Sequence, residues 1–287
     1  MPEVGRPSVL VIDGNRAAVR EQQVAAGGQP SGEGYAEVLK SLAAISCDIV
    51  RPADGAVQFA AGSGLSSYDG VVITGSALNV YDGGAHIERQ IELARATFAA
   101  GMPFFGSCWG LQVAVSAAGG RVRRNPRGRE FGFARRIELC AAGRRHAMFR
   151  GKPPVFEAIT VHGDDIEQLP EGAVELARND MGLQAIELRH GAGTFWGVQY
   201  HPEYSFSEIA ATAVRYGAAL IGDRLFADHA ELEVFVADLR ALMRDPRDRR
   251  LSWKYGLGPA LQEESCKLAE LRNWLELQVL PYGQKRH

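Results

Sequence analysis

Short apolar runs of strand length alternate with amphipathic stretches of helix length along most of this 287-residue chain. Parallel strands need a long crossover, usually a helix, whereas antiparallel strands can be joined by a tight turn. The alternation therefore predicts an α/β fold of three layers, with helices on both faces of a mostly parallel sheet. The expected strands are residues 8–12, 48–51, 71–74 and 102–105, and the expected helices are residues 35–45, 85–99 and 111–118, with a loop before residue 35.

The pattern changes twice further along the chain. Between residues 121 and 198 it becomes shorter and more strand-like, and a helix is expected over residues 206–221. From Gly222 the composition shifts: a charge-dense stretch occupies residues 244–250, and residues 261–277 are expected to form one amphipathic helix. We therefore expect residues 1–222 to form the main domain and residues 223–287 a helical carboxy-terminal extension. The extension is an added helical layer, a dimer contact or a cover over the active site.

The net charge of the chain and the spacing of its cysteines exclude several classes of partner and site. The chain has 32 basic and 34 acidic residues, a net charge of −2, so neither nucleic acid nor a membrane is an expected partner. Its four cysteines lie far apart and form no Cys-x-x-Cys pair, which indicates neither a zinc site nor a disulfide framework. Residues 1–9 lack the basic and apolar regions of a secretory signal, so we expect a cytoplasmic protein.

A possible nucleophile stands where an expected strand meets an expected helix. The sequence Gly106-Ser107-Cys108-Trp109-Gly110 matches the nucleophile-elbow pattern with cysteine in place of serine. Small residues on either side permit a sharp turn, and the amides at the start of the helix point at the thiolate and at any oxyanion that forms beside it. The pattern is short, and a buried structural cysteine is the alternative.

A base and its orienting acid are predicted near the end of the strand-rich region. His201 and Glu203 are two residues apart in the sequence Gly197-Val198-Gln199-Tyr200-His201-Pro202-Glu203, so in extended chain both side chains point to the same side. A carboxylate can then hold one ring nitrogen of the imidazole while the other faces a thiol. The acid follows the histidine, whereas in α/β-hydrolases it precedes the histidine.

These segments resemble the class I glutamine amidotransferases with a Cys-His-Glu triad, and they are similar to the glutaminase half of GMP synthetase. The resemblance covers about residues 8–221. It rests on five segments in the family's order: Gly106 to Gln112, Ala118 to Val122, Arg129 to Gly132, His162 to Asp164, and Gly197 to Glu203. It implies a flavodoxin-like three-layer fold.

The resemblance also implies roles for individual residues. Cys108 would be the nucleophile, His201 the general base and then acid, and Glu203 its orienter. The amide of Gly75 or Ser76, together with that of Trp109, would stabilise the oxyanion. The residues expected to line the substrate pocket are Gln112, Phe131, His162, Gly163 and Asp164, the last four near the amino and carboxylate ends of a glutamyl group.

The chain also departs from the family pattern. The loop after residue 74 is Gly75-Ser76-Ala77 where the family commonly has Gly-Gly-Pro, and residues 74–82 resemble the stand-alone branch that includes γ-glutamyl peptidases. We therefore expect a cofactor-free hydrolase that cleaves a γ-glutamyl amide through a γ-glutamyl thioester. The alternatives are a glutaminase subunit that delivers ammonia to a separate amide synthetase, and a non-catalytic binding or regulatory subunit. A homodimer through the extension is a further expectation.

Overall fold

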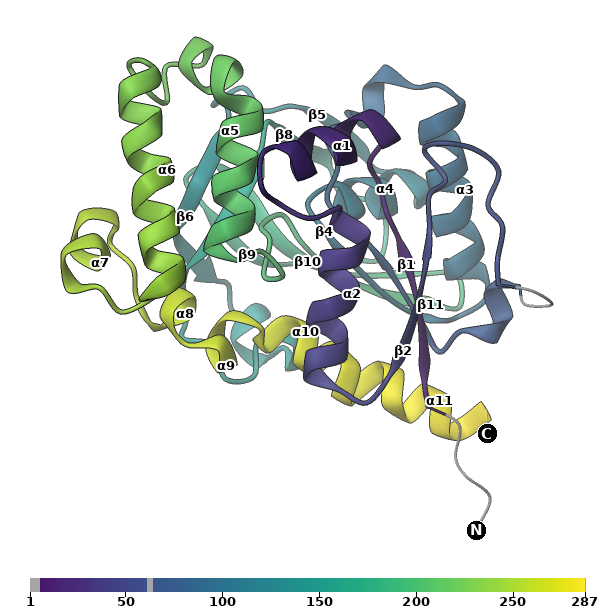
Figure 1. Cartoon of the computed structure of the whole chain (residues 1–287). Helices are drawn as coiled ribbons and strands as arrows, with labels where there is room; N and C mark the ends of the chain where they lie inside the picture. The colour runs from purple at the N-terminus through teal and green to yellow at the C-terminus, as the bar shows by residue number, and fades with distance from the viewer. Residues whose placement is uncertain (1–5, 61–63, 287) are drawn as a thin grey trace.

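The computed structural model describes residues 6–60 and 64–286 (Figure 1). Within them, nine strands form one large sheet in the order β2-β1-β3-β4-β11-β10-β9-β6-β7. The strands are β1 (Ser8–Ile12), β2 (Ser46–Val50), β3 (Gly70–Ile73), β4 (Pro103–Ser107), β6 (Glu130–Leu139), β7 (Val155–His162), β9 (Ala173–Asn179), β10 (Gly182–His190) and β11 (Gly193–Val198). A separate antiparallel pair consists of β5 (Arg121–Arg124) and β8 (Asp164–Gln168).

The large sheet has a parallel half and an antiparallel half. The five strands from β2 to β11 all pair in parallel. From β11 through β10, β9 and β6 to β7 every pairing is antiparallel. The sequence pattern becomes shorter and more strand-like after residue 121, and this change marks the transition. Strands joined by short turns must be antiparallel, because parallel strands need a long crossover. The predicted three-layer α/β fold is confirmed.

Helices cover the sheet on both faces. Their bounds are α1 (Ala17–Ala25), α2 (Ser31–Leu42), α3 (Ala85–Ala99), α4 (Trp109–Ala117), α5 (Phe206–Gly222), α6 (His229–Arg244), α7 (Arg249–Tyr255), α8 (Pro259–Gln262), α9 (Glu264–Lys267), α10 (Ala269–Trp274) and α11 (Leu280–Arg286). A π-helical turn (Leu275–Val279) joins α10 to α11, and short 3₁₀ turns occupy Leu65–Ser67, Val80–Asp82, Gly143–Arg145 and Ala147–Phe149.

Alternating side chains of the parallel strands enter two cores. Leu10 and Phe104 pack with α3 and α4, whereas Val11 and Phe105 pack with α2 and the carboxy-terminal helices. Figure 1 shows these elements around the sheet. The Trp274 ring lies 5.8 Å from that of Phe105. A third core joins α5, α6 and α7 to strands β6 and β7 of the antiparallel half. The extension therefore packs against the sheet as a helical layer, the first of the three roles left open above.

Three sequence expectations differ from the structure. Helix α1 lies within the segment expected to be a loop; only Gln23 of this helix is buried, so its apolar periodicity is weak. Strands β5 and β8 were not expected. The single helix expected over residues 261–277 is wrong, because the backbone leaves helical geometry at Glu263 (φ −111°, ψ 114°) and again at Leu268 (φ −96°, ψ 14°).

No helix in the part of the chain that the structure describes is long and apolar enough to cross a bilayer. Residues 1–5, on which the expectation about a signal segment partly rests, lie outside the described residues.

Candidate active site

The turn between β4 and α4 places Cys108 at the amino terminus of the helix. Its backbone has φ 51° and ψ −100°, a conformation that non-glycine residues rarely adopt and that is common at active sites. The flanking glycines are required sterically: a Cβ at Gly106 would lie 2.6 Å from the Gly110 carbonyl carbon, and one at Gly110 would lie 2.4 Å from the Ile73 oxygen. The Cys108 side chain is nearly buried and its Sγ lies 3.5 Å from the Val161 carbonyl oxygen.

The imidazole of His201 lies beside this thiol. The His201 backbone N–H donates to the Ile159 carbonyl over 2.8 Å, and its Nδ1 lies 2.8 Å from Oε1 of Glu203. The ring is 2% exposed, and Nε2 has no conventional hydrogen-bond partner among the described residues. Burial lowers the pKa of His201, but the Glu203 charge and interactions with Cys108 and Glu203 raise it to about 10. The ring is therefore protonated at neutral pH and can give up a proton to a neighbouring group.

Two buried hydroxyl groups continue the chain of hydrogen bonds behind the acid. Ser107 Oγ donates to Oε2 of Glu203 over 3.0 Å and lies 3.0 Å from the Tyr35 hydroxyl. Because the serine proton is used on the carboxylate, the tyrosine is the donor in the second bond. Both Glu203 oxygens are thus engaged, one by the imidazole and one by Ser107. The carboxylate is held in one orientation.

The loop after β3 lies against the His201 ring. A Cβ at Gly75 would lie 2.5 Å from Cε1 of His201, so only glycine fits. Asn15 fixes this loop from the end of β1: its Nδ2 donates to the Gly75 carbonyl over 3.3 Å and its Oδ1 accepts from the Ala77 amide over 3.0 Å. The backbone N–H groups of Gly75, Ser76 and Trp109 donate to no other described residue. They are therefore free to face an oxyanion.

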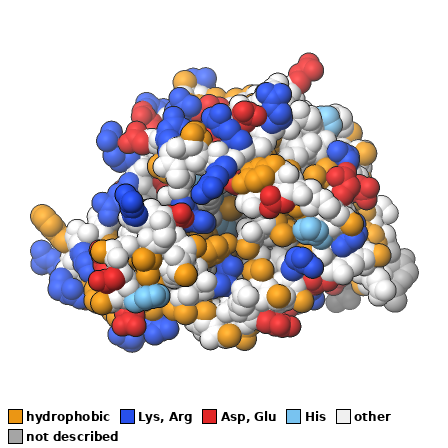
Figure 2. Space-filling model, turned by 90° about the horizontal axis from the view of Figure 1, so that it is seen from above, with side chains coloured by type: hydrophobic (Ala, Val, Ile, Leu, Met, Phe, Trp, Pro, Cys, Tyr) orange, Lys and Arg blue, Asp and Glu red, His pale blue; other side chains and the backbone are white. Residues whose placement is uncertain are grey.

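Cys108 opens into a cavity of about 280 Å³. Its lining includes six of the predicted site residues, Ser76, Cys108, Gln112, His162, Gly163 and Asp164. The cavity carries both signs of charge, because Arg124 and Arg129 line it together with Asp164. In Figure 1 the carboxyl end of β1 points upward, and Figure 2 shows that the face seen from above is hollowed near its centre.

Two of the predicted lining residues are held by other groups. Nε2 of His162 lies 2.9 Å from a Glu130 oxygen and Nδ1 lies 2.9 Å from the Asp164 carbonyl oxygen, so the ring is fixed in the cavity wall. Asp164 Oδ1 accepts a hydrogen bond from the Tyr81 hydroxyl over 2.8 Å, and burial raises the pKa of this carboxyl group.

Phe131 does not line the cavity. Its ring packs with Phe226 and Phe235 in the third core, although its strand partner, Val161, does line the cavity.

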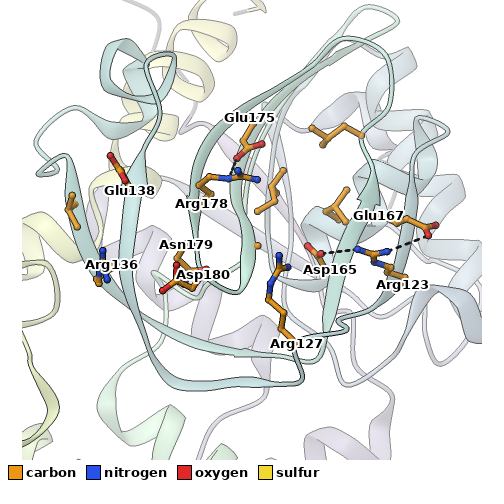
Figure 3. Close-up of a pocket in the computed structure, with 15 residues that line it drawn as sticks. Arg123, Arg127, Arg136, Glu138, Asp165, Glu167, Glu175, Arg178, Asn179 and Asp180 are labelled. Atoms are coloured by element: carbon orange, nitrogen blue, oxygen red, sulfur yellow. Dashed lines mark ion pairs between the residues drawn. The ribbon is translucent and has the colours of Figure 1, made fainter.

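A second cavity, of about 730 Å³, contains none of the predicted site residues (Figure 3). Strands of the antiparallel half and the β5–β8 pair surround it. Several of its charged side chains pair with one another: Arg178 with Glu175 at 2.8 Å, and Arg123 with Asp165 and Glu167 at 3.9 and 3.7 Å.

Sequence reasoning missed several residues of the site: Tyr35, Ser107, Tyr81, Arg124 and Tyr204. Ser107 carried a signal, since a hydroxyl group at a core-facing position of a buried strand needs a hydrogen-bond partner. Tyr35 and Tyr81 contact residues more than 70 positions away, and Arg124 lines the cavity from a strand that was not expected. Tyr204 directly follows the His201–Glu203 motif but carries no signal that its ring stacks on the histidine.

Comparison with known proteins identifies the family. The family described as glutamine amidotransferase class-I matches residues 36–217. The chain is similar to a gamma-glutamyl-L-1-hydroxyisopropylamide hydrolase of Pseudomonas, with 33% identity over 282 residues, 97% of this chain and 95% of the relative. It is also similar to the glutamine-hydrolysing GMP synthase of Streptomyces coelicolor, with 30% identity over 62% of this chain, but spans only 32% of that protein.

Solved structures share the fold. A glutamine amidotransferase from Thermotoga maritima superposes with a TM-score of 0.67 at 19% identity, covering 96% of this chain and 98% of that one. Another from Methylobacillus flagellatus gives a TM-score of 0.58 at 18% identity, covering 98% and 94%. With a family match over more than half its length, the chain belongs to the class I glutamine amidotransferases.

Proposed function

We propose that the protein hydrolyses a γ-glutamyl amide and releases glutamate and a small amine. The observation that carries the proposal is the contact of Cys108, which lines the cavity, with the imidazole of His201, whose other ring nitrogen is held by Glu203. Nucleophile, proton donor and oxyanion donors are then all supplied by the protein, so the reaction needs no cofactor or metal. The mixed charges of the cavity suit the α-ammonium and α-carboxylate groups of a γ-glutamyl moiety.

The reaction has two steps. The Cys108 thiolate attacks the side-chain amide carbonyl carbon, and the oxyanion faces the amides of Trp109 and of Gly75 or Ser76. His201 gives its proton to the departing nitrogen as the C–N bond breaks, which leaves a γ-glutamyl thioester. The ring, now neutral, takes a proton from a water that attacks the thioester. The C–S bond breaks, glutamate leaves, and the thiolate and imidazolium are restored.

Similarity favours an amine over ammonia as the leaving group. The relative named for a γ-glutamyl hydroxyisopropylamide aligns with nearly the whole chain, whereas the chain spans about a third of the Streptomyces GMP synthase. The GMP synthase similarity is the observation that favours the alternative, a glutaminase subunit that supplies ammonia to a separate synthetase.

One assay separates these functions. The purified chain alone is given L-glutamine, a γ-glutamyl dipeptide, γ-glutamyl isopropylamide and its hydroxylated analogue, and glutamate release is measured. We expect the highest kcat/KM on the small amides and no release by C108A. If glutamine were the only substrate from which glutamate is released, the protein would instead be the subunit that supplies ammonia to a synthetase. A folded protein that releases glutamate from none of them would refute the self-sufficient hydrolase; labelling of Cys108 by a glutamine-like electrophile would then indicate a glutaminase subunit that needs its partner, and an inert Cys108 the non-catalytic binding subunit.

Partner and location are further parts of the proposal. The four cysteines are free thiols in the structure, which suits the reducing cytoplasm. A homodimer through the extension would give the indole of Trp253, 86% exposed on α7, a partner surface. Sedimentation equilibrium of the wild type and of W253A tests this: we expect a dimer that W253A weakens, and a monomeric wild type would refute it.

A further inference from the structure

A lysine of the extension reaches the segment that carries the catalytic histidine and acid. Lys267, the last residue of α9, donates from Nζ to the Tyr204 carbonyl oxygen over 3.0 Å. Tyr204 directly follows Glu203 in the chain. The ammonium group is also close enough to Glu203 for the carboxylate charge to act on it, although burial lowers the pKa of Lys267 overall.

The residue held by Lys267 supports the imidazole directly. The Tyr204 ring stacks on His201 with the centroids 4.1 Å apart and the planes inclined by 23°. The Tyr204 backbone N–H also donates to the His201 carbonyl over 3.3 Å, which closes a tight turn around the acid. Anchoring the Tyr204 carbonyl therefore fixes the ring that covers one face of the imidazole.

A second contact holds the same segment on its other side. Glu270 of α10 accepts a hydrogen bond from the Tyr200 hydroxyl over 2.5 Å, and Tyr200 directly precedes His201. Glu270 also forms an ion pair with Lys152 at 3.0 Å, in which both side chains are almost completely buried. A buried ion pair tolerates little displacement, because separating it leaves an uncompensated charge. The catalytic histidine thus lies between two tyrosines that the extension holds.

We propose that the carboxy-terminal extension is a positioning element of the active site, in which Lys267 fixes the Tyr204 turn and so aligns the His201 imidazole with Cys108. This inference rests on the proposed function for its kinetic readout. The proposal gives a part in the reaction to residues that lie beyond the family match, which ends at residue 217. It also means that the triad can be aligned for catalysis without a partner protein.

The test replaces Lys267 with methionine, which keeps the aliphatic length and removes the ammonium group. We expect kcat on the best γ-glutamyl amide to fall about 10- to 100-fold, as a small misplacement of a catalytic group does. KM should stay within about twofold, because Lys267 does not line the cavity. K267R, which keeps a cationic donor, should recover most of the loss.

K254M is the matched control. Lys254 also belongs to the extension and donates to Asp238 over 2.6 Å, but it is exposed on α7, and its hydrogen bond and ion pair reach no residue of the site. We expect K254M to keep wild-type kcat and KM. A folded K267M with wild-type kcat, or a loss of the same size in K254M, would overturn the proposal.

A second readout does not depend on turnover. The thiolate absorbance near 240 nm, taken as the difference from C108A at neutral pH, should fall in K267M and not in K254M. If no γ-glutamyl amide is hydrolysed by the wild type, the proposed function fails while this comparison still decides the positioning role. If K267M does not fold, Y204L carries the test, since it removes the stacked ring and leaves the anchored carbonyl: unchanged thiolate absorbance and kcat in Y204L would refute the proposal.

Discussion

The two cavities of the molecule differ in how their polar groups are satisfied. The second cavity, on the antiparallel half of the sheet and called the groove below, is the larger: its volume is about 730 Å³, against about 280 Å³ for the cavity at Cys108. In this larger cavity, Arg123 of β5 pairs with Asp165 of β8, and Arg178 pairs with Glu175 on the same strand, β9 (Figure 3). Around Cys108, which lines the smaller cavity, Nε2 of His201 and the amides of Gly75 and Trp109 have no conventional hydrogen-bond partner among the described residues.

This difference shows that hydrogen-bonding groups without partners, gathered at one place, indicate a catalytic site better than the volume of a cavity does. Buried polar groups without partners destabilise a fold, so a cluster of them beside a strained cysteine needs an explanation, and a reacting carbonyl group provides one. The paired charges of the larger cavity are already satisfied by one another, so they do not require a functional explanation. Substitutions in the two cavities should therefore have very different effects on turnover.

Removing the charge of Glu203 should have the largest effect among the substitutions that keep the nucleophile. In E203Q we expect kcat to fall about 10³-fold or more, because the amide cannot orient and stabilise the imidazolium as the carboxylate does. The Glu203 charge raises the pKa of His201, which lies at about 10 in the wild type. The protonated ring is present below that pH, so wild-type turnover should decline as pH rises through about 10.

In E203Q the pKa of His201 should drop, and the basic limb of the kcat profile should move to lower pH by about one unit or more. Profiles of kcat and kcat/KM between pH 5 and about 11 measure this. A basic limb that does not move in a folded E203Q would show that the carboxylate does not set the protonation of the ring.

G75A should be the next most damaging change. The added methyl group would lie 2.5 Å from Cε1 of His201 and must displace either the ring or the loop. We expect about a 10²-fold loss of kcat from this misalignment. G55A is the control, because a Cβ at Gly55 meets no atom within 4 Å. Equal activity in both variants would contradict the placement of the loop against the imidazole.

S107A tests the hydroxyl groups behind the acid. It leaves one Glu203 oxygen and the Tyr35 hydroxyl without their partner. We expect kcat to fall about 10-fold, as with other groups that orient a catalytic residue, and the free energy of unfolding to drop by about 1–3 kcal/mol. Denaturant titration and steady-state kinetics measure the two effects. S41A, which removes a bond between Ser41 and its own helix on the surface, should change neither.

R178A in the groove should have the smallest effect. The Arg178–Glu175 pair is 64% and 30% exposed, so we expect its loss to change the free energy of unfolding by less than about 1 kcal/mol and kcat by less than about twofold. A large loss of turnover in this variant would mean that the groove takes part in the reaction, and the contrast between the cavities would fail.

Local features of the chain were predictable because their signals lie within one segment. The bounds of β1 and α3 agree with the sequence pattern, since each carries a clear periodicity. The turn at Cys108 follows from the small residues on either side of it. The triad contact joins segments 93 positions apart (201 − 108), and it was expected from the order of the motifs rather than from any local pattern.

Contacts between segments without a motif were not predictable. Tyr35 and Ser107 are 72 residues apart, and Lys267 and Tyr204 are 63 apart, so no periodicity relates them. Leu261, Leu268, Leu271 and Leu275 are buried as their spacing indicated, but they do not lie on one helix. A spacing of three or seven residues fixes which side chains face the core and leaves the intervening backbone free to break, as it does at Glu263.

The most direct test of the account is labelling with a glutamine-like electrophile such as a diazo ketone, followed by peptide mass spectrometry. The account predicts a label on Cys108 and none on Cys47, Cys140 or Cys266, with labelling slowed by a γ-glutamyl amide and abolished in a folded H201A variant. Equal labelling of the other cysteines, or an inert Cys108 in enzyme that still releases glutamate, would contradict it.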